Sequence, residues 1–393
     1  MAATNEEPCA QKAAILGAGA FGTALAQLMA RQGYRAVAWT RSADVADAIN
    51  STHENLPYLP GIELSEFVTA TTDVDEATAG ADIVFVVVPT QFVRAFIMTH
   101  RDSMPVGAPI VVCCKGVETA TLLTPFEILE EELPGKYHRS LACLSGPSFA
   151  REVAEGKPTS VTVAARSLDV ARRVQRTISD RFFRAYVSDD VVGVELFGAV
   201  KNILAIACGA SDGFEFGLNA RAALITRGLA EISRLAVRKG ASPLSMGGLC
   251  GVGDLVLTCT GSLSRNWTVG NRMACGEPLP DILHSMRQVA EGVKTAESVH
   301  ELCQKEGINM PICEEVYQVL FNGKSITDAL GSLQDRPLAD DFHLEMGGEM
   351  DGGAAAAAAA TPAAAAAIGS GAWAFGARRP SGNALGPRSP GGR

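Results

Sequence analysis

Short apolar runs alternate with longer, mixed segments over residues 12–188. The segment 83–88, IVFVVV, is typical because no polar residue interrupts it, as in a strand that is buried on both faces of a parallel sheet. On this pattern we predict strands at 12–16, 35–40, 67–70, 82–88, 109–114, 140–144, 159–165 and 182–187, with helix-length segments between them. The pattern predicts an α/β domain built on a doubly wound, mostly parallel sheet.

From residue 189 to about residue 335 the pattern changes. Apolar residues are spaced as in helices, the loops are short, and strand signals disappear. We therefore predict four parts: a short N-terminal extension at 1–11, the α/β domain at 12–188, an all-helical C-terminal domain at 189–335, and a disordered, low-complexity tail at 336–393 that is rich in Ala and Gly. The two central parts are long enough to build separate cores.

A glycine-rich turn stands between the first predicted strand and a helix-like segment at 23–31. In this context the pattern G-x-G-x-x-G indicates a dinucleotide site, because the turn and the helix N-terminus present N–H groups to a pyrophosphate. The alternative is an ordinary turn between strand and helix that happens to be rich in glycine. We predict a Rossmann-like domain whose cofactor-binding turn consists of Gly17, Ala18, Gly19, Ala20, Phe21 and Gly22.

The end of the second predicted strand bears on the choice between NAD and NADP. An acidic residue there usually holds the ribose 2′-hydroxyl of NAD. This chain instead has Thr40, Arg41 and Ser42, and the nearest carboxylate is that of Asp44. Arg41 is suited to the 2′-phosphate of NADP, but it is equally typical of a solvated surface position. The cofactor preference therefore stays open.

The carboxyl ends of parallel strands form the edge at which open α/β sheets bind their ligands. The predicted strands lead there into 89–92, into Lys115, and into 145–150, which includes Gly146 and Ser148. Lys115 is the only charged residue in this set. Its position predicts either a lysine of the site or an exposed lysine at the start of a loop.

Lys201 and Asn202 interrupt an otherwise apolar helical segment at 196–206. Burial of an ammonium group is costly, so such a lysine usually reaches solvent, pairs with a carboxylate or has a lowered pKa. A lysine of lowered pKa can act as a general acid or base near neutral pH, and a second cation such as Lys115 nearby would lower its pKa further. A purely structural lysine is the alternative.

A third segment combines glycines, hydroxyl groups, one arginine and one asparagine before a helix-like stretch. A guanidinium with neighbouring hydroxyl and amide groups suits a phosphate, although a capped loop with an exposed arginine has the same sequence features. The segment runs from Gly251 through Asp254 and Thr258 to Ser264, Arg265 and Asn266.

Composition narrows the class of partner and the compartment. The formal net charge of −9 argues against nucleic acid or an anionic membrane as the main partner, and the Ala-rich run at 352–376 is too weakly hydrophobic to predict a membrane span. Ten cysteines without C-x-x-C spacing, and no recognisable signal or transit peptide, indicate reduced thiols in the cytoplasm. His300 and Cys303 lie one helical turn apart without a second pair, so we predict no metal site.

Together these segments resemble the NAD(P)-dependent glycerol-3-phosphate dehydrogenases, in particular the bacterial-type branch of the family. The resemblance extends from Lys12 to about Leu333. It rests on GAGAFG (17–22), VVPTQF (87–92), CKG (114–116), GPSFAREVAEGKPT (146–159), VKN (200–202), GLNARAALITRGLAEI (217–232), GVGDLVLTCTGSLSRN (251–266) and VAEGVKTA (289–296). The long tail is not part of the family pattern.

The resemblance implies the reversible NAD(P)H-dependent reduction of dihydroxyacetone phosphate to sn-glycerol 3-phosphate, which links glycolysis to glycerol and glycerolipid synthesis, by a homodimer. It implies that Lys201 is the proton donor and acceptor, with Lys115 and Asp254 as further catalytic residues. Substrate contacts are implied for Lys115, Gly146, Ser148, Lys201, Asn202, Asp254, Thr258, Ser264, Arg265 and Asn266. Besides the glycine-rich turn, cofactor contacts are implied for Arg41, Phe92, Lys115, Ala150, Arg265, Val289 and Glu291.

Two other functions fit parts of the sequence. A β-hydroxyacid or ketopantoate-type reductase has a similar layout and uses a lysine, but a substrate without a phosphate does not need Arg265 and Asn266. A non-catalytic redox sensor that binds dinucleotides is expected to have a damaged lysine or a damaged phosphate loop. Neither is damaged in this chain.

Overall fold

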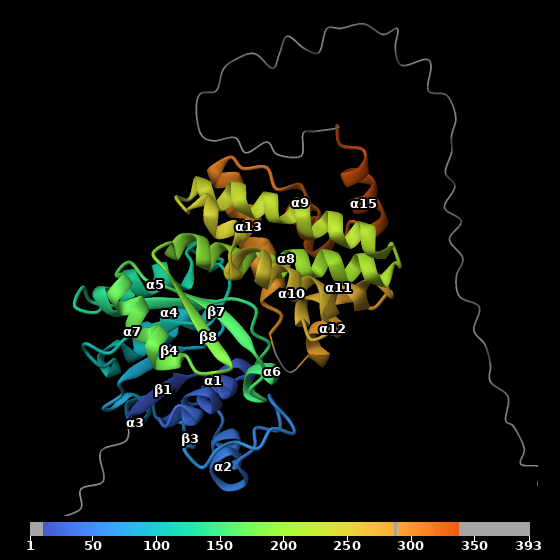
Figure 1. The fold of residues 1–393 in the computed structure, drawn as a ribbon. Helices are drawn as coiled ribbons and strands as arrows, with labels where there is room; N and C mark the ends of the chain where they lie inside the picture. The colour runs from blue at the N-terminus through green and yellow to red at the C-terminus, as the bar shows by residue number, and fades with distance from the viewer. Residues whose placement is uncertain (1–10, 287–288, 338–393) are drawn as a thin grey trace, which may run out of the picture. The chain divides into compact units, whose positions relative to one another are not determined.

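The computed structural model describes residues 11–286 and 289–337 (Figure 1). The predicted N-terminal extension, apart from Gln11, and the predicted tail beyond Pro337 lie outside the described residues. The described residues belong to one compact unit. The predicted boundaries near residues 189 and 336 stay predictions.

Eight strands form a single sheet in the order β3-β2-β1-β4-β5-β6-β7-β8. All neighbouring strands are parallel except β6 and β7, which run antiparallel in the register Leu144↔Val163. The strands are β1 (Lys12–Leu16), β2 (Arg35–Trp39), β3 (Val68–Thr71), β4 (Ile83–Val86), β5 (Ile110–Val112), β6 (Leu141–Ser145), β7 (Thr159–Ala164) and β8 (Phe183–Ser188). This confirms the predicted doubly wound, mostly parallel sheet.

Two predicted strands are too long by two residues at their carboxyl ends. β4 ends at Val86 because the chain soon reaches Pro89, which has no N–H to donate to a neighbouring strand and which precedes α4. β5 ends at Val112, although the Cys113 N–H still donates to Val86 O (2.9 Å). After β4 and β5 the chain therefore leaves the sheet at the carboxyl ends of the strands, where the candidate site lies.

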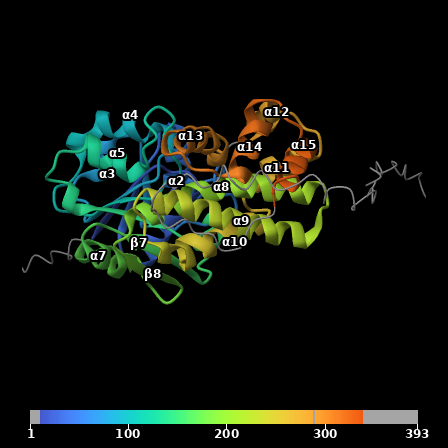
Figure 2. The ribbon, with the colours of Figure 1, turned by 90° about the horizontal axis from the view of Figure 1, so that it is seen from above.

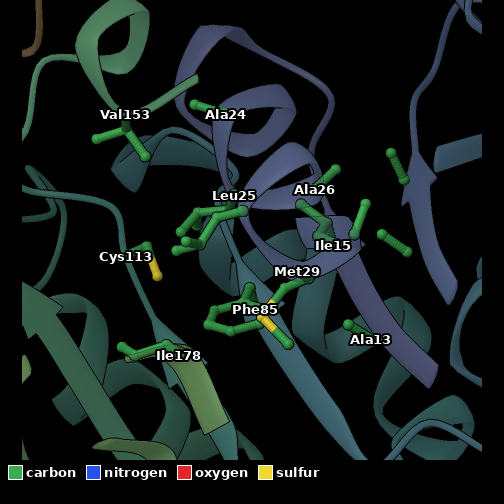
Figure 3. Close-up of a cluster of buried hydrophobic side chains, with 14 of the residues drawn as sticks. Ala13, Ile15, Ala24, Leu25, Ala26, Met29, Phe85, Cys113, Val153 and Ile178 are labelled. Atoms are coloured by element: carbon green, nitrogen blue, oxygen red, sulfur yellow. The ribbon is translucent and has the colours of Figure 1, made fainter. Parts of the chain in front are cut away.

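Alternate residues of the strands enter two cores, one on each face of the sheet. Ile15 of β1 lies in one core with Leu25, Met29 and Phe85, as Figure 3 shows, whereas Leu16 lies in the other core. This alternation is why the apolar runs of the sequence are continuous. Seven helices belong to the sheet region as described: α1 (Ala20–Arg31), α2 (Ala43–Thr52), α3 (Val74–Thr78), α4 (Thr90–His100), α5 (Pro125–Glu132), α6 (Ala150–Ala154) and α7 (Leu168–Ile178).

The second half of the described chain is helical. The long helix α8 lies at its centre, with α9, α10, α11 and α13 packed against it (Figures 1 and 2). By length and hydropathy α8 could cross a membrane, but 89% of its apolar window is buried inside the protein, as in a core helix. The helices are α8 (Val191–Gly213), α9 (Gly217–Arg238), α10 (Asp254–Thr260), α11 (Arg265–Ala274), α12 (Leu279–Ser285), α13 (Glu291–Glu306), α14 (Pro311–Phe321) and α15 (Ile326–Gln334).

Candidate active site

Two lysines share one buried aspartate at the edge of the sheet. Lys201 Nζ donates to Asp254 Oδ1, and Lys115 Nζ donates to Asp254 Oδ2 at 2.7 Å. Lys201 and Asp254 are buried, being 5% and 1% exposed. Residues that stand far apart in the sequence, at the end of β5, in the middle of α8 and at the start of α10, therefore meet at one carboxylate.

The short segment before α10 brings Asp254 into this position. Leu249–Gly253 forms one π-helical turn, in which Gly251 has non-helical dihedral angles (φ −84°, ψ −108°). A Cβ atom at Gly251 would overlap the carbonyl oxygen of Met246. The glycines that the sequence suggested for a phosphate cradle therefore form a tight turn that positions Asp254.

Charge and burial set the proton affinities of this cluster. Burial lowers the pKa of Lys201 to about 7; the ammonium of Lys115 lowers it as well, while the carboxylate of Asp254 opposes the shift. Burial alone would raise the pKa of Asp254, but the two ammonium groups hold it below its usual range. One carboxylate cannot balance two cations in a buried site, so this arrangement favours loss of a proton from Lys201.

Thr258 fixes the direction of the Lys201 ammonium. Its hydroxyl accepts from Lys201 Nζ (2.8 Å) and donates to the backbone oxygen of Asp254 (2.6 Å). Because the hydroxyl proton is used toward Asp254, the oxygen is free to accept from the lysine. Lys201 thus has two fixed partners and one further N–H for a third.

The predicted substrate residues on the β6–α6 segment lie beside Lys115. Gly146 O accepts from Lys115 Nζ (3.2 Å) and from Ser148 Oγ (3.0 Å). Gly146 has φ +139°, and a Cβ there would lie 2.9 Å from Val161 Cα. This close approach of the backbone to β7 requires glycine.

The predicted phosphate residues lie at the N-terminus of α11, next to α8. Asn266 Nδ2 donates to Asn202 Oδ1 (2.9 Å), and Asn266 Oδ1 accepts from Gly292 N (3.0 Å). The hydroxyl of Ser264 accepts from Trp267 N (3.3 Å) and so caps the helix. The helix N-terminus, two amides and the adjacent Arg265 therefore form a polar corner against α8, the helix that carries Lys201.

Arg265 leads from this corner toward the predicted cofactor residues. Its Nη1 donates to Val289 O (2.6 Å), which fixes an otherwise exposed guanidinium. Glu291, two residues farther on at the start of α13, accepts from Thr90 N through Oε1 (3.3 Å). Glu291 thereby joins the helical part to the N-terminus of α4.

The three glycines of the turn after β1 have three different surroundings. Gly17 has φ +124°, and a Cβ there would lie 2.9 Å from Val87 O, so it makes the tight turn. A Cβ at Gly22 would overlap Gly17 O, so it allows α1 to pack on the strand. A Cβ at Gly19 would meet nothing within 4 Å. The backbone at Gly19 is therefore open to a ligand.

The first N–H groups of α1 complete the fit to a dinucleotide. No backbone or side-chain acceptor of the described chain takes the N–H groups of Gly19, Ala20, Phe21 or Gly22. Free N–H groups at a helix N-terminus bind phosphate, so the turn fits a pyrophosphate. The helix begins at Ala20, three residues before the predicted start, because Gly19 is its N-cap.

Arg41 and Phe92 face each other across the same edge of the sheet. The guanidinium carbon of Arg41 lies 6.0 Å from the centre of the Phe92 ring, which is 52% exposed. Ala150, another predicted cofactor contact, is the first residue of α6. The structure does not pair Arg41 with a carboxylate in any interaction between described residues.

Among the described residues, no group of three or more His, Cys, Asp or Glu side chains could hold a metal ion.

Sequence reasoning missed two residues that shape the site. A Cβ at Gly198 would lie 2.6 Å from Ser145 Oγ and 3.7 Å from Lys115 Cδ, so this glycine lets α8 approach Lys115. Asn55 donates to the carbonyl of Ala18 in the glycine-rich turn. Neither residue belongs to a recognisable motif, and only the folded chain brings them to the site.

Two family models match the chain. The model "NAD-dependent glycerol-3-phosphate dehydrogenase N-terminus" matches residues 12–171, and the corresponding C-terminus model matches residues 190–331. A glycerol-3-phosphate dehydrogenase (NAD(P)+) of Myxococcus xanthus is 50% identical over 325 residues, which are 83% of this chain and 97% of that protein. The corresponding protein of Bacillus velezensis is 45% identical over 326 residues, 83% of this chain and 94% of that protein.

A solved structure agrees with these matches. The crystal structure of glycerol-3-phosphate dehydrogenase from Coxiella burnetii is similar with a TM-score of 0.79 and 36% identity, covering 84% of this chain and all of that one. The similarity thus includes both the sheet with its glycine-rich turn and the helices that carry Lys201 and Arg265. The chain belongs to the NAD-dependent glycerol-3-phosphate dehydrogenase family and is an NAD(P)-dependent oxidoreductase.

Proposed function

We propose that the protein catalyses the reversible reduction of dihydroxyacetone phosphate to sn-glycerol 3-phosphate, with Lys201 as proton donor and acceptor. The observation that carries the proposal is the buried Lys201, whose pKa of about 7 lets it change charge at neutral pH. A nicotinamide cofactor, when bound, would supply the hydride to C2 in reduction and accept it in oxidation. The relatives named above carry this activity in their names, which supports the same reaction here.

The proton step uses the chain's own residues. In reduction, Lys201 Nζ gives one proton to the C2 oxygen as the hydride reaches C2, so the carbonyl becomes an alcohol and the lysine becomes neutral. Lys115 binds the substrate and stabilises the negative charge that develops on this oxygen. Asp254 and Thr258 hold Lys201 in one direction throughout. In oxidation the neutral Lys201 removes the proton from the hydroxyl group.

The phosphate group is proposed to bind at the N-terminus of α11. Arg265 offers a charged fork, and a doubly charged phosphate needs such a cation in a chain of net charge −9. Asn202, Ser264 and Asn266 supply neutral contacts, because their side chains converge on this corner. Gly146 and Ser148 are proposed to contact the substrate from the side of Lys115.

The cofactor is proposed to bind along the carboxyl edge of the sheet. Residues 17–22 would hold the pyrophosphate, for which their free N–H groups are suited. Phe92, Ala150, Val289 and Glu291, together with Arg265 and Lys115, would line the path toward the nicotinamide. The fit of residues 17–22 to a pyrophosphate and the family resemblance support these cofactor contacts.

Arg41 is proposed to contact the 2′-phosphate of NADPH. No carboxylate stands at residues 40–42 to hold the 2′-hydroxyl of NADH or to repel a phosphate there. We expect Arg41→Ala to raise the KM for NADPH about tenfold and to change the KM for NADH by less than twofold. An equal change for both cofactors would contradict this role.

The phosphate is the feature that separates this function from the phosphate-free reductases. The test compares dihydroxyacetone phosphate with dihydroxyacetone in wild type and in Arg265→Ala. We expect the wild type to prefer the phosphorylated substrate by about 100-fold in kcat/KM, and Arg265→Ala to lose most of that preference. Equal rates with both substrates in the wild type would contradict the proposal.

We also propose that the enzyme is a homodimer in the cytoplasm. Leu218 at the start of α9 and Leu244 beyond its end are 74% and 88% exposed. Apart from these two leucines, a groove of about 1220 Å³ with apolar walls opens between α9, α14 and α15. Exposed apolar surface of this kind marks protein interfaces, and we assign it to a second copy. Light scattering of the wild type and Leu218→Asp tests this: the wild type should have twice the mass of one chain, and the variant should be monomeric. A monomeric wild type would contradict it.

A further inference from the structure

A buried asparagine lies behind the glycine-rich turn. Asn55 is 1% exposed, and its Nδ2 group donates to Ala18 O (3.0 Å) and to Thr23 Oγ1 (2.7 Å). A carbonyl oxygen only accepts, so the amide has to present Nδ2 to Ala18. The Oδ1 atom has no hydrogen-bond partner among the described residues. Both N–H bonds of the Asn55 side-chain amide are therefore used, one toward the Ala18 carbonyl in the turn and the other toward Thr23 in α1.

The segment 53–64 holds Asn55 in place. Asn55 O accepts from Leu59 N (2.7 Å), and the Leu59 side chain is buried in the same core as α1. Pro60 O accepts from Arg151 Nη2 in α6 (2.6 Å). Figure 1 shows this segment after α2, on the side of α6. The segment is thus anchored to α1 and α6, and it holds Asn55 in a fixed position next to the turn.

The carbonyl of Ala18 decides the direction of the next N–H group. In a planar trans peptide the C=O of one residue and the N–H of the next point in opposite directions. When Asn55 holds the Ala18 carbonyl, the Gly19 N–H therefore points away from Asn55. That N–H has no partner among the described residues, and the side of Gly19 on which a Cβ would stand is open.

We propose that Asn55 is a positioning residue for the cofactor, holding the Ala18 carbonyl back and directing the Gly19 N–H toward the pyrophosphate. Without Asn55 only the Thr23 hydroxyl, at 3.5 Å, still donates to the Ala18 carbonyl among the described residues. The peptide between Ala18 and Gly19 is then held less firmly, and its rotation would bring a carbonyl oxygen toward the phosphate oxygens, acceptor against acceptor. The proposal rests on pyrophosphate binding at residues 17–22.

The test measures binding of ADP-ribose, which contains the pyrophosphate, and of adenosine, which does not, by competition with NADH fluorescence. We expect Asn55→Ala to weaken ADP-ribose about tenfold and adenosine less than twofold, with kcat at saturating cofactor unchanged. Asn50→Ala is the matched control, because Asn50 joins α2 to Ala70 of β3 by two bonds of 2.8 Å and does not contact the turn. It should leave both ligands unchanged.

Binding of ADP-ribose does not depend on turnover, so this result is independent of the proposed reaction. The proposal is overturned if folded Asn55→Ala binds ADP-ribose as the wild type does, or loses adenosine and ADP-ribose equally. If Asn55→Ala does not fold, Thr23→Val decides. It keeps the shape of the side chain but removes one acceptor of Asn55 and the second, longer bond to the Ala18 carbonyl. We expect about threefold weaker ADP-ribose binding in Thr23→Val, and unchanged binding would overturn the proposal.

Discussion

At the scale of single residues, the account depends on how one buried carboxylate divides its charge between two lysines. Asp254 pairs with Lys115 through one oxygen and with Lys201 through the other. Lys115 retains more contact with solvent than Lys201, whose side chain is 7% exposed against 19% for Lys115. Removal of water penalises the charged form, so Lys201 is the lysine that becomes neutral near pH 7.

This predicts opposite pH dependences for the two directions of the reaction. Reduction needs protonated Lys201, so its kcat/KM should fall as the pH rises through about 7; oxidation needs neutral Lys201, so its kcat/KM should rise over the same interval. Initial rates from pH 5 to 9 in both directions check this. Profiles with the same sign in both directions would contradict the role of Lys201.

Lys115 provides a test of the cause of the shifted pKa. Its ammonium lowers the pKa of Lys201, so Lys115→Met should move the midpoint of both pH profiles to higher pH as well as reduce the rate. The position of the midpoint is measurable at the lower rate. An unchanged midpoint would mean that burial and Asp254 set the pKa of Lys201 without a contribution from Lys115.

Much of the site could be predicted at this scale, and the reason is chemical. A lysine and an asparagine within an apolar helix, or an arginine beside hydroxyl groups, stand out from their surroundings. Asn55 does not stand out, because it lies in a mixed loop 37 residues from the carbonyl that it holds. The shared carboxylate of Asp254 was likewise not deducible from spacing and came only from the family resemblance.

At the scale of elements, two glycines set how closely α8 and α11 approach. A Cβ at Gly209 of α8 would overlap Trp267 O, and a Cβ at Gly270 of α11 would overlap Ile206 O. The contact matters to the site because α8 carries Lys201, while the N-terminus of α11 carries Arg265. The distance between the proton donor and the proposed phosphate corner therefore depends on these two glycines.

Gly270→Ala should accordingly separate the two helices. We expect the KM for dihydroxyacetone phosphate to rise about 10- to 100-fold and the affinity for NADH to fall by a smaller factor, because Arg265 is only one of the proposed cofactor contacts. The control is Gly331→Ala in α15, where a Cβ would meet nothing within 4 Å; it should raise stability by about 0.5–1 kcal/mol and leave the kinetics unchanged. Steady-state kinetics and thermal unfolding of both variants check this, and an unchanged KM in Gly270→Ala would contradict it.

The elements themselves were largely predictable, because uninterrupted apolar runs indicate strands of a buried sheet. The antiparallel direction of β7 was not, since its pattern of residues equals that of its parallel neighbours. The start of α1 was also missed. In the sequence, residues 20–22 look like part of the glycine-rich turn. In the structure they form the first turn of α1, in which the backbone N–H groups have no partner within the helix.

At the scale of the whole molecule, the family pattern ends well before the chain does. The Myxococcus xanthus relative is matched over 97% of its length by 83% of this chain, and the matching family models end at residue 331. We expect a chain ending at Glu345 to keep the kcat, the KM values and the melting temperature of the full chain. A loss of activity above about twofold on truncation would assign the final segment a part in catalysis or assembly.

The central claim is that Lys201 exchanges a proton with the substrate during hydride transfer. The most direct measurement is the loss of nicotinamide absorbance when dihydroxyacetone phosphate is added to wild type and to Lys201→Met, with NADH and NADPH in parallel. The account predicts turnover by the wild type and a rate at least about 100-fold lower in Lys201→Met, which should still bind the cofactor. Wild-type rates in Lys201→Met, or no turnover of the wild type with either cofactor, would contradict it.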